Sequence, residues 1–314
     1  MQQHWLGWIL ASCVVLSLYD ICKKASVRGN AVFPTLLGST FAGWLAVTAS
    51  LAVRGEFAAA LSLPPRHIAL LLVKSGIVGA SWTATYMALR TLPITCAAPI
   101  RATGPLWTLL GAIVLFAEVP TLVQAAGMAM VVAGCVLFSL SARREGIDFR
   151  RDRAVWLAFL GTLLGSCSAL YDKHLLRGLG IPTGAVLWWF LGGMCAIYAV
   201  AAASPLVLSQ LRCWCFRGFA AGADAASPRV PGVAFSWRWT IPLVGVLLAL
   251  SDACYFNAVA VPDARISVLS MIRRSSVVLT FLLGGAVFHE TNLWRKAVAL
   301  AAILAGVAIL CLRS

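Results

Sequence analysis

The strongest constraint on this chain is an internal repeat that twice places an arginine inside apolar sequence. Residues 101–134 and 273–306 match position for position at one offset, so that Arg101 corresponds to Arg273. Self-similarity at about half the chain length indicates two copies of one structural unit. An ionised side chain in lipid-soluble sequence is costly and therefore indicates function or pairing. The repeat predicts a pseudo-symmetric architecture with charge at its centre.

The composition places this architecture in a membrane. The chain has 314 residues, of which 61% are hydrophobic and only 11% charged, whereas soluble domains carry about 25% charged residues. A run of about 20 apolar residues crosses a bilayer. We therefore predict an all-α integral membrane protein with ten transmembrane helices. The predicted spans are 5–22, 31–53, 68–89, 94–117, 122–140, 156–175, 184–203, 241–260, 266–288 and 296–312.

The repeat divides the predicted helices into two sets of five. Tyr19-Asp20 recurs as Tyr171-Asp172, and Tyr86 recurs as Tyr255. Because five is odd, the second copy enters the membrane with the opposite orientation, as in inverted-repeat transporters. The predicted division is a first repeat at 1–140, a basic connecting loop at 141–155, and a second repeat at 156–314 that contains the loop 204–239.

The net charge of +14 reflects topology rather than nucleic-acid binding. Fifteen of the 25 Lys and Arg residues lie on one side of the predicted spans and six lie on the other. This asymmetry places the side with more Lys and Arg residues in the cytosol and both termini on the outside. The expected location is a cell membrane, either an inner or a plasma membrane. Most of the ten cysteines lie inside spans, which predicts packing roles, and no motif indicates a metal or another cofactor.

The two copies resemble a known repeat. Residues 86–134 contain Gly104-Pro105, Glu118 and Ala133-Gly134, and this block and residues 255–306 both look like an EamA repeat. The whole chain resembles the ten-helix EamA-type transporters of the drug/metabolite transporter (DMT) superfamily. This resemblance implies two inverted five-helix bundles around a central cavity, lined heavily by the third, fourth, eighth and ninth helices. Family members are commonly drawn with both termini in the cytosol, opposite to the charge count.

The second copy departs from the family pattern. It has Val277 where the first copy has Gly-Pro, and it doubles its arginine as Arg273-Arg274. Neighbouring residues on a helix point about 100° apart, so we do not expect both arginines to face inward.

Charged residues inside the predicted spans are the first candidates for a site. The deep cations are Lys74, Arg101, Arg273 and Arg274, and the deep anion is Asp252, with Asp20 and Asp172 nearer the span ends. If Asp252 neutralises one cation, positive charge remains. An anionic or carboxylate-bearing metabolite would complete the site, because arginine binds carboxylate and phosphate bidentately.

The same residues allow a structural interpretation. Arg101 and Arg273 can each pair with one of the repeated aspartates, Asp20 and Asp172, or cap carbonyl groups at a helix break. Asp252 is then either a proton carrier or a permanent partner of Lys74 or an arginine. With structural arginines, the substrate would be a neutral or zwitterionic amino acid or a drug.

Polar and aromatic residues complete the predicted cavity. Trp82, Tyr86, Tyr255 and Asn257 lie on the third and eighth spans and are expected to form its walls. Glu290 and its counterpart Glu118 end spans and are expected to cap turns or pair with loop cations, with gating as the alternative.

These features favour a secondary transporter that moves a small organic metabolite by alternating access. Its expected partners are the substrate and the lipid bilayer, without nucleic acid, and both a monomer and a dimer are compatible with the sequence. A membrane-embedded enzyme is less favoured, because the sequence has no HxxxH, DDxxD, G-x-S-x-G or Walker motif. The coupling ion and the direction of transport stay open.

Overall fold

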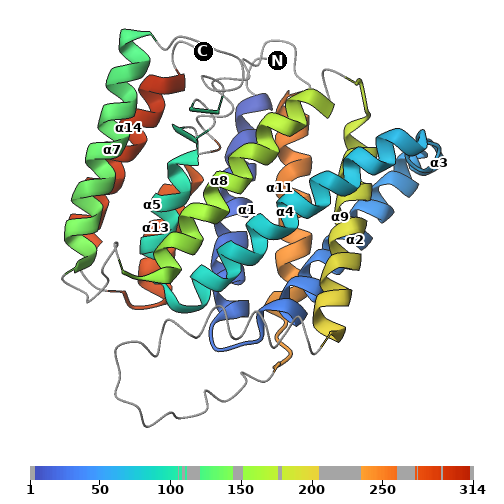
Figure 1. Cartoon of the computed structure of the whole chain (residues 1–314), viewed down its shortest axis with the longest axis horizontal. Helices are drawn as coiled ribbons and strands as arrows, with labels where there is room; N and C mark the ends of the chain where they lie inside the picture. Colours follow the sequence, from blue (N-terminus) through green and yellow to red (C-terminus); the bar gives the residue numbers. More distant parts are fainter. Residues whose placement is uncertain are drawn as a thin grey trace.

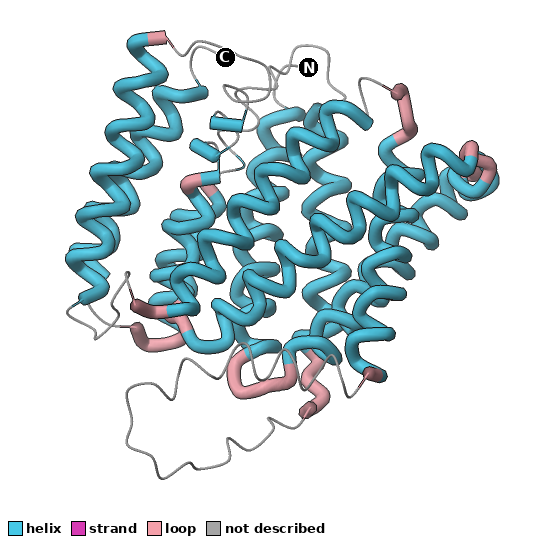
Figure 2. Tube along the Cα trace, viewed as in Figure 1, coloured by secondary structure: helices cyan, strands magenta, loops and turns pink. Residues whose placement is uncertain are grey.

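The computed structural model describes most of the chain as helices and short turns (Figure 2). The described residues are 4–104, 106–107, 110–111, 121–143, 151–175, 179–204, 235–259, 273, 275–290 and 293–311. Within these ranges there is no β-strand, which confirms the predicted all-α class.

Each predicted span coincides at least in part with a described helix. The helices of the first half are α1 (His4–Val27), α2 (Val32–Arg54), α3 (Phe57–Leu61), α4 (Pro65–Thr91), α5 (Ile94–Ala102) and α7 (Leu122–Arg143). Those of the second half are α8 (Arg153–Lys173), α9 (Thr183–Ala203), α11 (Thr240–Val259), α13 (Ser276–Val287) and α14 (Leu293–Cys311). By length and composition, α1, α2, α4, α8 and α9 each suffice to cross a bilayer. The protein is a multi-pass membrane protein, and the number of ten spans stays a prediction.

Local sequence explains where several helices begin and end. Gly55 ends α2 in the left-handed conformation, with φ 70°, which glycine adopts without a steric penalty. Pro65 starts α4, where its missing N–H costs nothing, and the Asp152 side chain caps α8 by accepting from the Ala154 N–H at 2.8 Å. The predicted end of the first span at residue 22 is wrong, because α1 continues to Val27.

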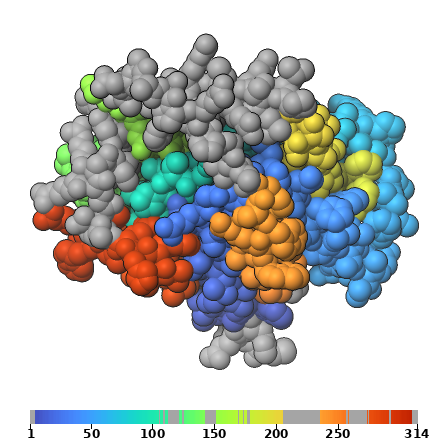
Figure 3. All heavy atoms as spheres, turned by 90° about the horizontal axis from the view of Figure 1, so that it is seen from below, coloured from blue at the N-terminus to red at the C-terminus, as the bar shows by residue number. Residues whose placement is uncertain are grey.

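The helices pack in pairs that the repeat relates to each other. α1 packs on α11 as α4 packs on α8, and α2 packs on α11 as α4 packs on α9. α2 also packs on α9, α5 on α13, and α7 on α14, so each of these helices meets its own counterpart (Figure 1). In Figure 3 the orange α11 lies between the blue α1 and α2. This pattern is what two inverted copies of one bundle predict. The boundaries at 1–140, 141–155 and 156–314 stay predictions.

Small residues allow the closest of these contacts. A Cβ atom at Gly306 of α14 would lie 2.8 Å from the Gly127 carbonyl oxygen of α7, and one at Gly134 would lie 2.9 Å from the Ile303 nitrogen. Gly43 of α2 and Gly245 of α11 form a second close crossing. Because lipid supplies no hydrophobic drive between helices, such close backbone packing holds membrane bundles together.

The connections fall on two opposite faces of the molecule. The start of α1, the end of α2 and the end of α14 lie on one face (Figure 1). The turns around 28–31, 92–93 and 288–290 and residues 235–239 lie on the other. The second face, here called the basic face, is the side to which the charge count assigns most Lys and Arg residues.

Candidate functional site

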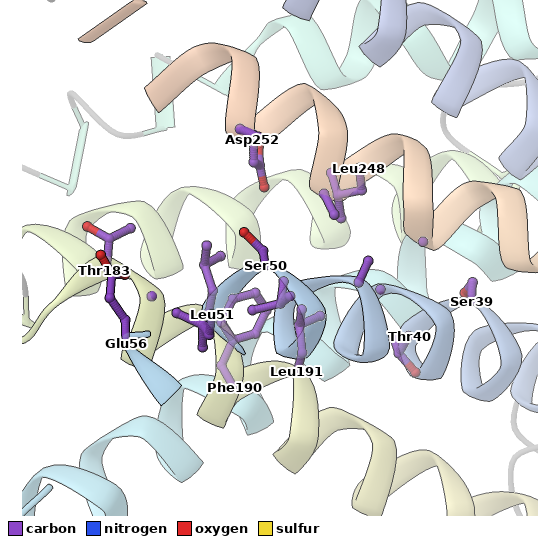
Figure 4. Close-up of a pocket in the computed structure, with 18 of the residues that line it drawn as sticks. Ser39, Thr40, Ser50, Leu51, Glu56, Thr183, Phe190, Leu191, Leu248 and Asp252 are labelled. Atoms are coloured by element: carbon purple, nitrogen blue, oxygen red, sulfur yellow. The ribbon is translucent and has the colours of Figure 1, made fainter. Parts of the chain in front are cut away.

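A cavity of about 470 Å³ lies where the two halves meet. Its walls come from α2 and α4 of the first half and α9 and α11 of the second. Most of the surface is apolar, and hydroxyl groups of Ser39, Thr40, Ser50 and Thr183 are spaced along it (Figure 4). This size and mixture are typical of a site for a small organic molecule.

The two ends of the cavity differ in charge. Arg54 and Glu56 line the end beside the face where α2 ends, and both are exposed. Asp252 lines the cavity further inside, on α11 across from Ser50 of α2 (Figure 4). The charged lining residues are therefore two carboxylates and one arginine, rather than the cluster of cations that the sequence predicts.

The helices that form the cavity also differ from those that the family resemblance implies. The third and eighth spans, α4 and α11, contribute as expected, but α5 and α13 contribute no described lining residue. Their place is taken by α2 and α9. Of the predicted site residues, Trp82 and Asp252 line the cavity.

Three ion pairs engage the intramembrane charges of the described residues. Arg101 bonds to Asp20, Lys74 to Asp172, and Arg273 to Asp252. The sequence predicted that positive charge would remain unpaired, and this is wrong for these three cations, each of which has an aspartate partner. Asp20 and Asp172 reach deep enough to neutralise two of them. Arg274 lies outside the described residues.

The pairing follows the repeat in one half only. The Arg101–Asp20 pair was one of the structural alternatives and is confirmed. The corresponding Arg273–Asp172 pair does not form, because Lys74 of α4 takes Asp172 and leaves Arg273 to Asp252. Neither Lys74 nor Asp252 has a charged counterpart in the other copy, so the asymmetry arises from these two residues.

The Asp252–Arg273 pair lies at the cavity wall. A single oxygen, Oδ1, accepts from the Arg273 Nη2, and the Asp252 side chain is 24% exposed. The Arg273 guanidinium carbon lies 4.4 Å from the centre of the Tyr255 ring, a distance typical of a cation–π contact. Tyr255 thus supports the arginine.

Two further predicted site residues, Lys74 and Tyr86, are buried and do not line the cavity. Lys74 is 4% exposed, and its Nζ lies 4.9 Å from the centre of the Phe190 ring, which does line the cavity. Tyr86 is fully buried, and its hydroxyl has no hydrogen-bond partner among the residues that the structure describes. Asn257 lies on α11, where only its backbone is described.

Three buried lysines were not predicted as part of any site. Lys23 is 5% exposed and lies over the rings of Tyr19 and Tyr86 at 5.0 and 5.4 Å. Lys24 donates to the Leu89 and Leu92 carbonyl oxygens, and Lys296 is fully buried. The prediction counted all three as loop cations because it ended α1 too early and began the last helix too late.

No group of three His, Cys, Asp or Glu side chains in the described part of the chain is arranged to hold a metal ion. The described helices form a pseudo-symmetric membrane protein. A cavity lined by apolar and polar residues lies between its two halves.

Comparisons with known proteins relate the first part of the chain to a transporter family. The EamA-like transporter family matches residues 3–140, and an uncharacterized transporter in the cobO 3′ region of Sinorhizobium sp. is 26% identical over 141 residues. That relative is covered over 99% of its length but corresponds to 45% of this chain. One crystal structure covers 96% of this chain and 94% of its own, with a TM-score of 0.57 and 19% identity, and supports the fold alone. The family match over residues 3–140 and the transporter relative support an EamA-type membrane transporter of the DMT superfamily.

Proposed function

We propose that the protein is a secondary transporter that carries a small organic metabolite through the cavity between α2, α4, α9 and α11 by alternating access. The observation that carries the proposal is that this cavity is walled by both halves of an inverted repeat and reaches charged groups inside the membrane. A site at the interface of inverted repeats can face either side when one half rocks against the other. The proposed location is a cell membrane, with the substrate and lipid as partners.

Filling the cavity tests this route directly. Ser50 is an exposed cavity residue, and we expect Ser50→Trp to lower transport in liposomes at least tenfold while the melting temperature stays within a few degrees. Ala49→Trp is the matched control, because Ala49 is also exposed but does not line the cavity. Wild-type transport by Ser50→Trp would place the route elsewhere.

For the substrate, the ion pairs favour a zwitterionic solute with an apolar body over a simple anion. Lys74, Arg101 and Arg273 each have an aspartate partner, so none of these three predicted site cations awaits an anion. Asp252 lines the cavity and uses Oδ1 for Arg273, so its second carboxylate oxygen is a candidate acceptor for an ammonium group, with Arg273 beside it for a carboxylate. The apolar walls then accommodate the rest of the molecule.

An anionic substrate is the second candidate. Arg273 uses one nitrogen for Asp252 and its side chain is 21% exposed, which leaves guanidinium N–H groups for a carboxylate that displaces Asp252. The two candidates differ in which charge of the substrate matters.

A matched set of probes separates these candidates. Leucine, isoamylamine and isocaproate share one carbon skeleton and carry both charges, only the ammonium, or only the carboxylate. We expect leucine to compete best for counterflow into liposomes. Asp252→Asn is expected to weaken leucine and isoamylamine about tenfold, because the lost interaction is a charge-assisted hydrogen bond.

Glu56→Gln is the control, because it neutralises the other carboxylate of the cavity at its exposed end. Stronger competition by isocaproate than by leucine would favour the anionic substrate. Product formation without counterflow of any probe would refute transport and support the enzyme alternative.

A further inference from the structure

Glu290 connects the second half of the protein to the first at the basic face. Its Oε1 accepts from the Ile94 N–H at 2.7 Å, and its Oε2 accepts from the Thr95 N–H at 3.0 Å and from the Thr95 hydroxyl. The Thr95 oxygen in turn accepts from the buried Nζ of Lys296 at 3.0 Å. We call Ile94, Thr95, Glu290 and Lys296 the basic-face latch.

In the latch, the carboxylate binds at the N-terminal end of a helix. Ile94 and Thr95 are the first residues of α5, where the N–H groups have no partner within the helix and the helix dipole is positive. A carboxylate that bridges two such groups forms charge-assisted hydrogen bonds, which are stronger than neutral ones. At the edge of a membrane, water can take over these groups when the carboxylate leaves. The contact is therefore both strong and reversible.

The turn that presents Glu290 has an unusual backbone. His289, immediately before it, has φ 52°, a left-handed conformation that is sterically unfavourable for a non-glycine residue. Such conformations persist where the surrounding structure holds them and often mark functional positions. Here the turn directs the carboxylate from the end of α13 to another helix.

A second set of contacts joins the halves at the same face. The Asn30 side chain donates to the Ser236 carbonyl oxygen at 2.8 Å and accepts from the Ser236 N–H at 2.9 Å. Arg238 donates to the Arg28 carbonyl oxygen at 2.9 Å, near the end of α1. The exposed cavity residues Arg54 and Glu56 lie at the end of α2, on the opposite face (Figure 1). The halves are thus bonded together on the basic face, while the cavity approaches the other.

We propose that Glu290 is a gating residue of the transport cycle: its bonds to Ile94 and Thr95 keep the basic face closed and must break for the cavity to open there. This proposal rests on the alternating-access function above. It assigns to Glu290 a role that depends on a contact between the halves, and not on binding substrate, since Glu290 does not line the cavity.

Hydrogen–deuterium exchange of the full chain in detergent tests the gate without substrate. In Glu290→Gln one of the two carboxylate oxygens becomes an NH2 group, which cannot accept a hydrogen bond from the Ile94 or Thr95 N–H. We therefore expect about tenfold faster amide exchange at residues 94–97. The decisive readout lies elsewhere: exchange at 235–240, which Glu290 does not contact, is expected to accelerate, and exchange at 56–63 and 179–184 is expected to slow. This reciprocal change across the membrane is expected of a gate and not of local fraying.

Asp152→Asn is the matched control, because Asp152 is also a helix-capping carboxylate but caps α8 within its own half. It is expected to accelerate exchange at 152–156 alone. If Glu290→Gln does not purify, Thr95→Val removes the two hydroxyl bonds of the latch, to Glu290 and from Lys296, but keeps both backbone N–H bonds to Glu290, and is expected to act in the same direction with a smaller effect. Acceleration confined to residues 93–97 in either variant would overturn the gating role. Because no substrate is needed, failure of the gate and failure of counterflow are read separately.

Discussion

A methyl group added at Gly245 is expected to destabilise the protein by about 3 kcal/mol, which corresponds to a fall of about 10 °C in melting temperature. A Cβ atom there would overlap the Ser39 carbonyl oxygen and the Gly43 nitrogen of α2. Both are backbone atoms, so no side chain can rotate to make room, and α2 and α11 must separate. Since Gly43 and Gly245 also line the cavity, Gly245→Ala is expected to lose transport as well. Thermal unfolding in detergent measures the first effect, and counterflow in liposomes measures the second.

Gly76→Ala provides the comparison. Gly76 lies in the middle of α4, and a Cβ atom there meets nothing within 4 Å. Alanine is also the better helix former, by roughly 0.5–1 kcal/mol, so this variant is expected to melt at or above the wild-type temperature. Equal melting temperatures for the two variants would show that the α2–α11 crossing is looser than the structure has it.

Arg101→Ala is expected to reduce stability by about 3–5 kcal/mol, because it leaves a buried carboxylate without its cation. The Asp20 side chain is 3% exposed, and its other oxygen accepts from the Thr280 hydroxyl at 3.3 Å. Asp20 thereby joins α1 to α5 and α13. We expect a large fall in the yield of monodisperse protein and in its melting temperature. The double variant Asp20→Asn/Arg101→Ala is expected to recover much of both, since the unpaired charge is gone.

Arg54→Ala controls for the loss of an arginine as such. Arg54 is exposed beside the cavity, so its removal is expected to leave the melting temperature unchanged. A wild-type melting temperature for Arg101→Ala, together with lost transport, would contradict the structural role of Arg101. It would instead support the interpretation that this arginine engages an anionic substrate.

The fold was predictable to a large extent because the bilayer restricts the alternatives. Long apolar runs in a membrane can only form helices or closed barrels, so hydropathy placed a helix within each span. The ends of the helices were less predictable. The predicted first span ended at residue 22 and left Lys23 and Lys24 outside it, but α1 continues to Val27, and Lys24 donates to the carbonyl oxygens of Leu89 and Leu92 inside the protein. Their burial depends on where α4 ends, which the α1 sequence does not contain.

The candidate site was predictable in part. The sequence identified Asp252 and Trp82, which line the cavity, and it offered Asp20 as the partner of Arg101. It did not identify α2 and α9 as cavity walls, because their Ser and Thr residues look like ordinary small residues of a packed membrane helix. Nor could it choose between cap and gate for Glu290, whose partners lie 195 and 196 residues away in sequence.

The sequence by itself determined that the protein is an all-α membrane protein with charged residues inside its apolar segments, and it predicted two inverted repeats. Apolar length and charge asymmetry are properties of the chain alone. The tertiary structure decided which charge meets which: Lys74 takes Asp172, and Arg273 turns to Asp252. Ion pairs form between side chains only a few ångströms apart, and that proximity depends on how closely helices cross, which glycine contacts such as Gly43–Gly245 fix.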